Sequence, residues 1–260
     1  MPVALTIAGS DSSGGAGLQA DLLTFAAFGV YGASVVTAVT AQNTTGVRAI
    51  APIAPDVVAA QLDAVLDDLD VRAAKTGMLH RAAVVEIVAA RLRARPVPQL
   101  VVDPVTVSTS GATLLEPSAL DALRGALLPL ATLVTPNLHE AEALTGRPVR
   151  DVAEMREAAR ALVGHGARAA LVTGGHLPGD AVDVLYDGAT YRELSAARVA
   201  TQHTHGTGCA LSAAITAGLA RGDDLVRAVE AAKQHVTQAL ATVPGLGRGA
   251  GPVDHLRGRR

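Results

Sequence analysis

Val3-Ala4-Leu5-Thr6-Ile7-Ala8 is a short apolar run that leads, through the glycine-rich segment Gly9–Gly17, into a helical stretch over Gly17–Phe28. Because the run is continuously apolar rather than alternating, it predicts a parallel β-strand that is covered on both faces. Short β-branched runs go on alternating with longer amphipathic stretches along the chain. This alternation predicts the α/β class, with right-handed crossovers and one mostly parallel, doubly wound sheet flanked by helices.

The remaining elements follow the same rhythm. Further strands are expected at Ser34–Thr40, Ala73–Thr76, Leu100–Asp103, Leu133–Thr135 and Ala169–Thr173. Further helices are expected at Pro55–Leu69, Arg81–Arg95, Pro117–Leu130, Val152–Gly164, Cys209–Ala220 and Asp224–Thr242. Val182–Tyr186 and Thr190–Leu194, joined through Asp187-Gly188, break the rhythm and predict a small β-hairpin. No linker or internal repeat divides residues 1–260, so we expect one domain, with a tail over residues 244–260 that is partly loose.

Composition narrows the class of protein further. Hydrophobic residues make up 49% of the chain and aromatic residues only 2%, so aliphatic side chains must form the core. A net charge of −2 gives no support for binding to nucleic acid or to a membrane surface. The single cysteine, Cys209, excludes an intrachain disulfide and fits a reducing compartment. Because the chain shows neither a basic leader nor an apolar run near the ~20 residues of a membrane span, we expect a cytoplasmic protein.

The strongest functional signal is Thr204-His205-Gly206-Thr207-Gly208-Cys209-Ala210-Leu211-Ser212, where a loop enters a long apolar helix. Glycines let the backbone approach a ligand closely, and the first amide groups of a helix have no partners within it. With the helix dipole, such an entrance suits a transferring phosphoryl group, and Cys209 at the helix start would have its thiolate favoured. The pattern alone fits equally well a glycine-rich helix entry in which a buried cysteine acts as a small hydrophobe.

Other polar residues follow predicted strands, at the sheet edge where ligands of such folds bind. Asp103 ends one strand and Glu140 begins the helix after the next, so the pair could organise Mg²⁺ around nucleotide phosphates. Asn137 and Glu140 also have the spacing of a capping box, and both interpretations can hold together. Thr173-Gly174-Gly175 closes a strand as a nucleotide-contacting turn would, although an ordinary turn explains it equally well.

Two further segments are weaker signals on their own. Gln42 ends a strand, and its amide could bind the edge of a heterocycle, but most buried glutamines satisfy backbone groups. Gly9–Gly17 has neither the glycine spacing of a dinucleotide-binding turn nor the Gly-Lys of a P-loop, since the only lysines are Lys75 and Lys233. The pattern around Asp21, on the following helix, is by itself typical of an exposed acid.

In order along nearly the whole chain, these segments resemble the bifunctional hydroxymethylpyrimidine/phosphomethylpyrimidine kinases of thiamine biosynthesis, in the ribokinase-like superfamily. The matching motifs are Leu5–Asp11, Ser13–Asp21, Thr40–Thr44, Lys75–Met78, Asp103–Val105, Thr135–Asn137, Gly206–Cys209 and Gly251–Val253. The Gln42 segment and the Gly-Thr-Gly-Cys loop discriminate best, because many sugar kinases of this superfamily carry Asp at the position of Cys209.

The resemblance implies an enzyme that phosphorylates 4-amino-5-hydroxymethyl-2-methylpyrimidine with ATP and Mg²⁺, first to the monophosphate and then to the diphosphate. It implies a homodimer of single-domain, ribokinase-like subunits. The implied pyrimidine pocket comprises Gly9, Asp21, Gln42, Met78 and Val105, with Gln42 at the ring edge and Asp21 at its amino side. Gly206, Thr207 and Gly208 would form an anion hole, with Cys209 in the place of the general base. Asp103, Asn137 and Glu140 would serve magnesium and phosphate, and Thr173 and Gly175 the nucleotide.

The chain departs from the family pattern at two places. It has Thr106-Val107-Ser108-Thr109 where relatives often have Met-Val-Ala-Lys, which removes an expected lysine near the phosphates. Its tail reads Arg248-Gly249-Ala250-Gly251-Pro252-Val253 where relatives often have Gly-His-Gly-Pro-Val. The first departure bears on how the second phosphorylation is supported.

Three other functions compete with this interpretation. A pyridoxal kinase of the same superfamily would also act on a ring-borne hydroxymethyl group. A thiol hydrolase would use Cys209 with His205, although no third triad member stands out and the glycine-rich entry suits phosphate better. A non-catalytic pyrimidine-binding protein would keep the fold and bind the ligand without transferring phosphate.

Overall fold

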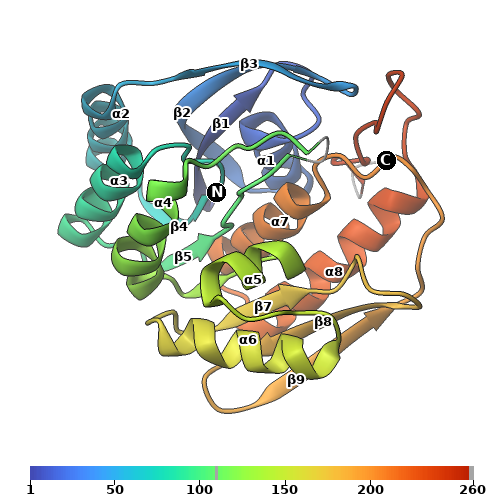
Figure 1. Cartoon of the computed structure of the whole chain (residues 1–260). Coiled ribbons are helices and arrows are strands. Elements are labelled where there is room, and N and C mark those ends of the chain that lie inside the picture. Colours follow the sequence, from blue (N-terminus) through green and yellow to red (C-terminus); the bar gives the residue numbers. More distant parts are fainter. Residues whose placement is uncertain (109–110, 258–260) are drawn as a thin grey trace.

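The computed structural model describes residues 1–108 and 111–257, and within them nine strands form one sheet (Figure 1). The strand order is β3-β2-β1-β4-β5-β6-β7-β8-β9. Neighbours from β2 to β7 are parallel, whereas β3 pairs antiparallel with β2, and β8 and β9 continue antiparallel from β7. The strands are β1 Val3–Asp11, β2 Tyr31–Asn43, β3 Gly46–Pro52, β4 Val71–Thr76, β5 Gln99–Val102, β6 Leu133–Val134, β7 Ala170–Thr173, β8 Ala181–Tyr186 and β9 Tyr191–Ala196.

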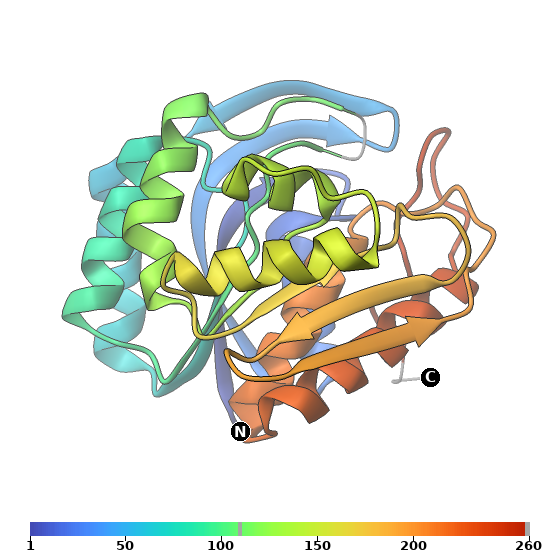
Figure 2. The ribbon, with the colours of Figure 1, turned by 60° about the horizontal axis from the view of Figure 1, so that its bottom comes forward.

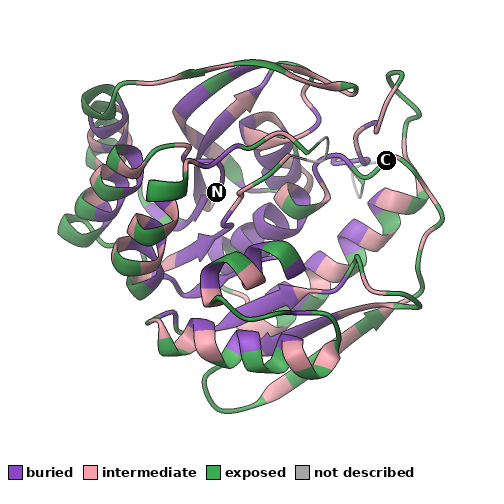
Figure 3. Ribbon diagram, in the orientation of Figure 1, coloured by how far each residue is buried: buried purple, intermediate pink, exposed green. Residues whose placement is uncertain are grey.

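Helices cover both faces of this sheet, as predicted for the doubly wound α/β class (Figures 1 and 2). Successive residues of a strand point to opposite faces, so Leu100 and Val102 pack in the layer under α2 to α6, and Val101 packs in the layer under α1, α7 and α8. The helices are α1 Gly17–Ala27, α2 Pro55–Asp68, α3 Ala82–Ala94, α4 Pro117–Ala122, α5 Leu138–Thr145, α6 Val152–Gly164, α7 Thr207–Arg221 and α8 Leu225–Ala241. Figure 3 shows that α7 and the central strands are the most buried elements.

Most sequence predictions of these elements are confirmed. Pro55 and Pro117 each lie at the start of a helix, where the missing N–H has no intrahelical partner to lose. The β8–β9 hairpin forms as predicted, and α6 lies along β8 (Figure 2). The helix expected over Pro117–Leu130 is not regular: after α4 the chain forms a π-helical turn, Leu123–Leu127, and a 3₁₀ turn, Leu128–Leu130. Pro129 explains the change, because its ring removes a backbone donor inside the helix.

The last described segment of the chain is docked rather than free. We expected the tail from Pro244 to be partly loose, and residues 258–260 lie outside the described residues. However, the His205 backbone donates to Gly251 O at 3.2 Å and accepts from Val253 N at 3.3 Å, so this segment pairs with the loop before α7. Val253 and His255 are buried. The segment thereby fixes one wall of the region where the strands end.

The carboxyl ends of the parallel strands meet at one edge, which is where ligands of such sheets bind. Ile7 of β1 pairs with Thr76 of β4, and Thr76 pairs with Val102 of β5. Gly9 near the end of β1, and Gly77 and Asp103 directly after β4 and β5, therefore lie side by side. The strand order also reverses at β1, with β2 on one side and β4 on the other, which places a crevice there.

Candidate active site

A cavity of about 850 Å³ opens over this edge of the sheet. Its wall contains every site residue predicted from the sequence except Asp21. The predicted ring contacts, the predicted nucleotide contacts and the entrance of α7 therefore line one continuous space. The residues brought together are Gly9, Gln42, Met78, Asp103, Val105, Asn137, Glu140, Thr173, Gly175, Gly206, Thr207, Gly208 and Cys209.

Asp21 lies beneath the cavity floor, so the prediction that it contacts a ligand is wrong. Its side chain is fully buried, with one carboxylate oxygen 2.9 Å from Lys75 Nζ and the other accepting from Thr6 Oγ1 at 2.5 Å. Both oxygens are therefore engaged within the protein. Asp21 is also not the exposed acid that the local pattern suggested. Its side chain pairs with Lys75, which lies 54 positions later in the sequence.

Lys75 is the main residue that the sequence analysis did not select. It is fully buried, and its Nζ lies 3.6 Å from Asp103 Oδ2 as well as beside Asp21. Burial lowers the pKa of Lys75, but the negative charges of Asp21 and Asp103 outweigh it, so its pKa is raised and the ammonium stays charged. A lysine at the end of an apolar strand, in a chain with only two lysines, was the available signal.

The entrance of α7 has the geometry of an anion site. Gly206 has φ 81°, and a Cβ there would lie 1.9 Å from Gly15 O, so only glycine fits this turn. Across residues 1–108 and 111–257, no hydrogen bond engages the backbone N–H groups of Gly208 and Cys209. Thr207 differs from the prediction, because its N–H donates to Thr204 O at 3.2 Å. Two amides at a helix N-terminus on a cavity wall can bind an oxyanion.

Cys209 lies where predicted, but its thiol is neutral. Burial raises the pKa of Cys209 to about 12; Lys75 acts in the opposite direction, while Asp21 and Asp103 add to the increase. The expectation that the helix start would favour the thiolate is therefore wrong for the protein without ligands, because desolvation and two carboxylates outweigh the helix terminus. Only a small fraction of Cys209 is therefore thiolate at neutral pH, but that fraction is a strong base.

Two carboxylates face the cavity close to this anion site. Asp103 Oδ2 accepts a hydrogen bond from Ser212 Oγ at 2.9 Å. Glu140 forms the predicted capping box: its backbone donates to Asn137 Oδ1 at 3.0 Å, and its Oε2 accepts from Asn137 N at 2.9 Å. Burial raises the pKa of Glu140 to about 8, and the charge of Asp103 adds to the increase.

These carboxylates fit a cation that takes most of its ligands from elsewhere. No group of three or more potential metal ligands occurs in the described parts of the chain. Magnesium in nucleotide sites is usually held by one or two carboxylates, with waters and phosphate oxygens completing the octahedron. Two neighbouring buried carboxylates that repel each other match that donor set, since a cation between them would relieve the repulsion.

We predict that Glu140→Gln makes the ligand-free protein more stable than the wild type, by an amount that grows as pH rises. The pKa of Glu140 is 4.5 in the unfolded chain and about 8 in the folded one, so folding binds a proton between these values. Its contribution to stability is therefore complete below pH 4.5 and is lost as pH approaches 8. Glutamine keeps the capping acceptor without the charge, so the Tm of the variant should exceed that of the wild type by about 5 °C at pH 8 and by little at pH 5. Equal Tm differences at both pH values, measured by calorimetry, would contradict this.

At the end of the cavity near β7 and β8, hydrogen bonds hold several backbone and charged groups in place. Gly174 N donates to Asp183 Oδ1 at 3.0 Å, and Lys233 Nζ donates to Asp183 Oδ2 at 2.7 Å. Arg198 donates to the carbonyls of Gly175, Leu177 and Gly179, which fixes the turn after β7. Lys233, the second of the two lysines, thus also lines the cavity. Thr109, where relatives often carry a lysine, lies outside the described residues.

The opposite end of the cavity, here called the ring end because the predicted ring contacts lie there, is small. It is polar on one side and apolar on the other. A Cβ on Gly9 would lie 3.1 Å from Met78 Sδ, so Gly9 and Met78 form a close, apolar inner wall. Gln42 Nε2 lies 3.2 Å from His205 Nε2, and that nitrogen lies 2.8 Å from Asp11 Oδ2. Burial opposes ionisation of Asp11, but hydrogen bonds from His205 and Ser13 outweigh it and lower its pKa. Sequence reasoning missed Asp11, which anchors the glycine-rich turn to the loop before α7.

The fold and this site define the chain as a kinase of the ribokinase-like class. The ADP complex of Bacillus subtilis pyridoxal kinase superposes with a TM-score of 0.92, at 42% sequence identity over 98% of this chain and 97% of that one. The family model of phosphomethylpyrimidine kinase matches residues 11–254, and the chain belongs to that family.

Two curated relatives agree with this assignment. The hydroxymethylpyrimidine/phosphomethylpyrimidine kinase of Rhizobium meliloti is 54% identical over 98% of this chain and 97% of its own length. The thiamine biosynthesis bifunctional protein ThiED of Geobacter sulfurreducens is 50% identical over 97% of this chain and 52% of its own length. The resemblance seen in the sequence motifs is therefore confirmed at the level of the family.

Proposed function

We propose that this chain transfers the γ-phosphoryl group of ATP to 4-amino-5-hydroxymethyl-2-methylpyrimidine, and then a second one to the resulting monophosphate, in thiamine biosynthesis. The observation that carries the proposal is the pair of unengaged amides at Gly208 and Cys209, on the wall of the same cavity as the residues expected to hold the ring and the nucleotide. The names of the relatives and the ADP bound to the pyridoxal kinase support the substrate and the nucleotide.

The chemistry asks the protein mainly for positioning and for neutralisation of charge. The amides at the start of α7 would bind the transferring group, where one such donor contributes ~3 kcal/mol to transition-state stabilisation. Asp103 and Glu140 would hold Mg²⁺, which lowers the charge on the phosphates when it is bound. Gly9, Met78, Val105 and Gln42 would hold the ring, and Cys209 would accept the hydroxyl proton.

The direct test is to incubate the protein with the hydroxymethylpyrimidine, ATP and Mg²⁺ and to follow both phosphorylated products by mass spectrometry. We expect monophosphate to appear first and diphosphate to follow. A parallel reaction with pyridoxal addresses the second candidate function, which the superposition on a pyridoxal kinase specifically favours. Faster turnover of pyridoxal than of the pyrimidine would show that pyridoxal, rather than the pyrimidine, is the substrate.

A thiol hydrolase and a non-catalytic binding protein would each behave differently in the same assay. A thiol hydrolase requires a reactive thiolate, and a pKa of about 12 for Cys209 argues against one. Ester turnover without ATP would nevertheless support it. Tight pyrimidine binding without any phosphorylated product would support a non-catalytic protein.

We predict that Gln42→Ala raises the KM for the pyrimidine at least tenfold and leaves the KM for ATP within about twofold. Gln42 lies at the ring end of the cavity, away from the Lys233 and Asp183 end, and loss of its amide removes hydrogen bonds to the ring edge. Initial rates at varied concentrations of each substrate measure the two constants. Equal increases in the two KM values would show that Gln42 does not bind the pyrimidine.

We also propose that the protein acts in the cytoplasm as a homodimer. Among the described residues no helix is long and apolar enough to cross a bilayer. The strand β3 is an edge of the sheet, and an edge strand presents unpaired backbone groups that a second copy can cover. Light scattering during size-exclusion chromatography gives the mass that tests the dimer.

A further inference from the structure

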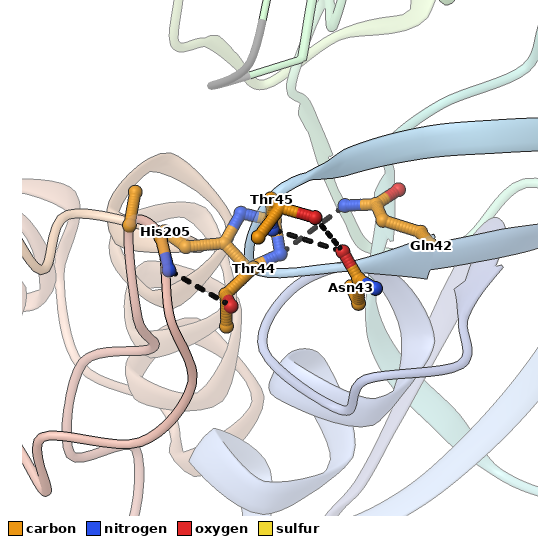
Figure 4. A pocket seen from close by; sticks show the side chains of 7 residues that line it. Gln42, Asn43, Thr44, Thr45 and His205 are labelled. Atoms are coloured by element: carbon orange, nitrogen blue, oxygen red, sulfur yellow. Dashed lines mark hydrogen bonds between the residues drawn. The ribbon is translucent and has the colours of Figure 1, made fainter.

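A second, smaller space adjoins the ring end of the cavity. It has a volume of about 410 Å³ and lies between the turn that joins β2 to β3 and the segment before Gly251 (Figure 4). Gln42 and His205 line both this space, here called the outer pocket, and the main cavity. The other residues that line the outer pocket are Asn43, Thr44, Thr45, Gly249 and Ala250.

The walls of the outer pocket are held in a fixed arrangement. Thr44 Oγ1 accepts hydrogen bonds from the backbone N–H groups of Arg248 and Gly249, both at 3.2 Å. A Cβ on Gly249 would lie 2.0 Å from Thr44 O, so the two segments touch closely. Asn43 Oδ1 accepts from Thr45 N and Thr45 Oγ1, at 2.9 and 2.6 Å, which orders the turn. The pocket is thus a built feature with hydroxyl and amide groups on its wall.

The two proposed phosphorylations place different demands on the position of the ring. In the first, the hydroxymethyl oxygen forms a bond to the γ-phosphorus, the bond from that phosphorus to the bridging oxygen breaks, and ADP leaves with the electron pair. The hydroxyl proton goes to the thiolate form of Cys209 or to solvent. In the second, a non-bridging oxygen of the monophosphate makes the same attack on a new ATP. The attacking atom must occupy the same place at the entrance of α7 in both steps, because the amides there do not move with the substrate.

The ring therefore lies one phosphate group farther from α7 in the second step than in the first. It cannot move deeper, because Gly9, Met78 and Leu114 close the inner wall and are packed against one another or against buried neighbours. The nucleotide occupies the opposite direction. The adjoining space is the outer pocket, which shares Gln42 and His205 with the main cavity.

Resting on the proposed function, we propose that the outer pocket holds the pyrimidine ring of the monophosphate during the second phosphorylation. Gln42 stands on the boundary, with its amide directed toward His205 (Figure 4), so it can bind the ring edge in either position. Hydroxyl and amide groups of Asn43 and Thr45 supply further polar partners for an aminopyrimidine. After the first transfer, ATP replaces ADP and the pyrimidine ring of the monophosphate moves into this pocket.

The test fills the outer pocket from each wall and measures the two steps separately. Ala250→Leu adds side-chain volume from the C-terminal side and Thr45→Leu from the turn, and neither residue lines the main cavity. Ala241→Leu makes the same change as Ala250→Leu on the exposed end of α8, outside both spaces, and serves as the control. One assay starts from the hydroxymethylpyrimidine and the other from supplied monophosphate, with Tm measured for each variant.

We expect both pocket variants to form diphosphate at least tenfold more slowly, with a higher KM for the monophosphate, and to form monophosphate within about twofold of the wild type. The control should match the wild type in both assays. Equal losses in the two steps, or none in either, would overturn the proposal. Absence of monophosphate formation by the wild type would instead remove the proposed function, and the proposal with it.

Discussion

Cys209→Ala should lower kcat for monophosphate formation by ~10²-fold or more and should spare diphosphate formation from supplied monophosphate. The hydroxymethyl group must lose a proton as it attacks, and the Cys209 thiol is positioned at the start of α7 on the cavity wall. A phosphate monoester has its second pKa near ~6, so it reaches the active site as a dianion with no proton to give up. The two steps therefore differ in their need for a base.

The pKa of Cys209 gives this prediction a second readout. Since burial raises the pKa of Cys209 to about 12, its basic form grows throughout the accessible pH range, and the rate of the first step should rise with pH without a plateau near neutrality. The second step needs no base for its nucleophile and should lack this continuing rise. Cys209→Ala should abolish the rise in the first step. Equal effects on both steps, or an unchanged kcat in the first, would make Cys209 a packing residue.

Lys75→Met should destabilise the protein by ~3–5 kcal/mol, the largest stability effect that we predict. Methionine fills similar volume, but it leaves Asp21 and Asp103 buried without their shared cation. A loss of this size lowers Tm by roughly 10 °C in a chain of this length. Thermal unfolding followed by circular dichroism measures it.

The matched control for this prediction is the double variant Lys75→Met/Asp21→Asn. Asparagine still accepts the hydrogen bond from Thr6 but carries no charge, so the double variant should recover part of the lost stability. Positive coupling of this kind shows that the unpaired carboxylate, rather than lost packing, is the cause. If the double variant were less stable than Lys75→Met alone, the ion pair would not be the source of the effect.

Local patterns in the sequence predicted the parts of the structure that depend on local chemistry. The apolar run of β1, the proline at the start of α2 and the capping box of Asn137 and Glu140 each follow from neighbouring residues. The strand β3 was missed because it is an edge strand with much of its surface exposed, so it lacks the apolar pattern of a buried one.

The remaining errors concern groups whose surroundings come from distant segments. Asp21 meets Lys75 only through the pairing of β1 with β4, which no local motif encodes. Thr207 was expected to offer an amide, but the turn before α7 uses that amide internally. The thiol pKa of Cys209 depends on burial and on three charges from other elements. The sequence could place these residues at the site, whereas their ionisation and bonding required the tertiary structure.

The docking of Gly251–His255 has a consequence for when the enzyme becomes active during its synthesis. His255 Nε2 lies 2.9 Å from Gly15 O, and His205 is hydrogen-bonded to the backbone on both sides of Pro252. A nascent chain too short to include residues 251–255 lacks this contact, although its sheet is already translated. The anion site is therefore finished only once these residues have been made, and a polypeptide released short of them would retain much of its core without it.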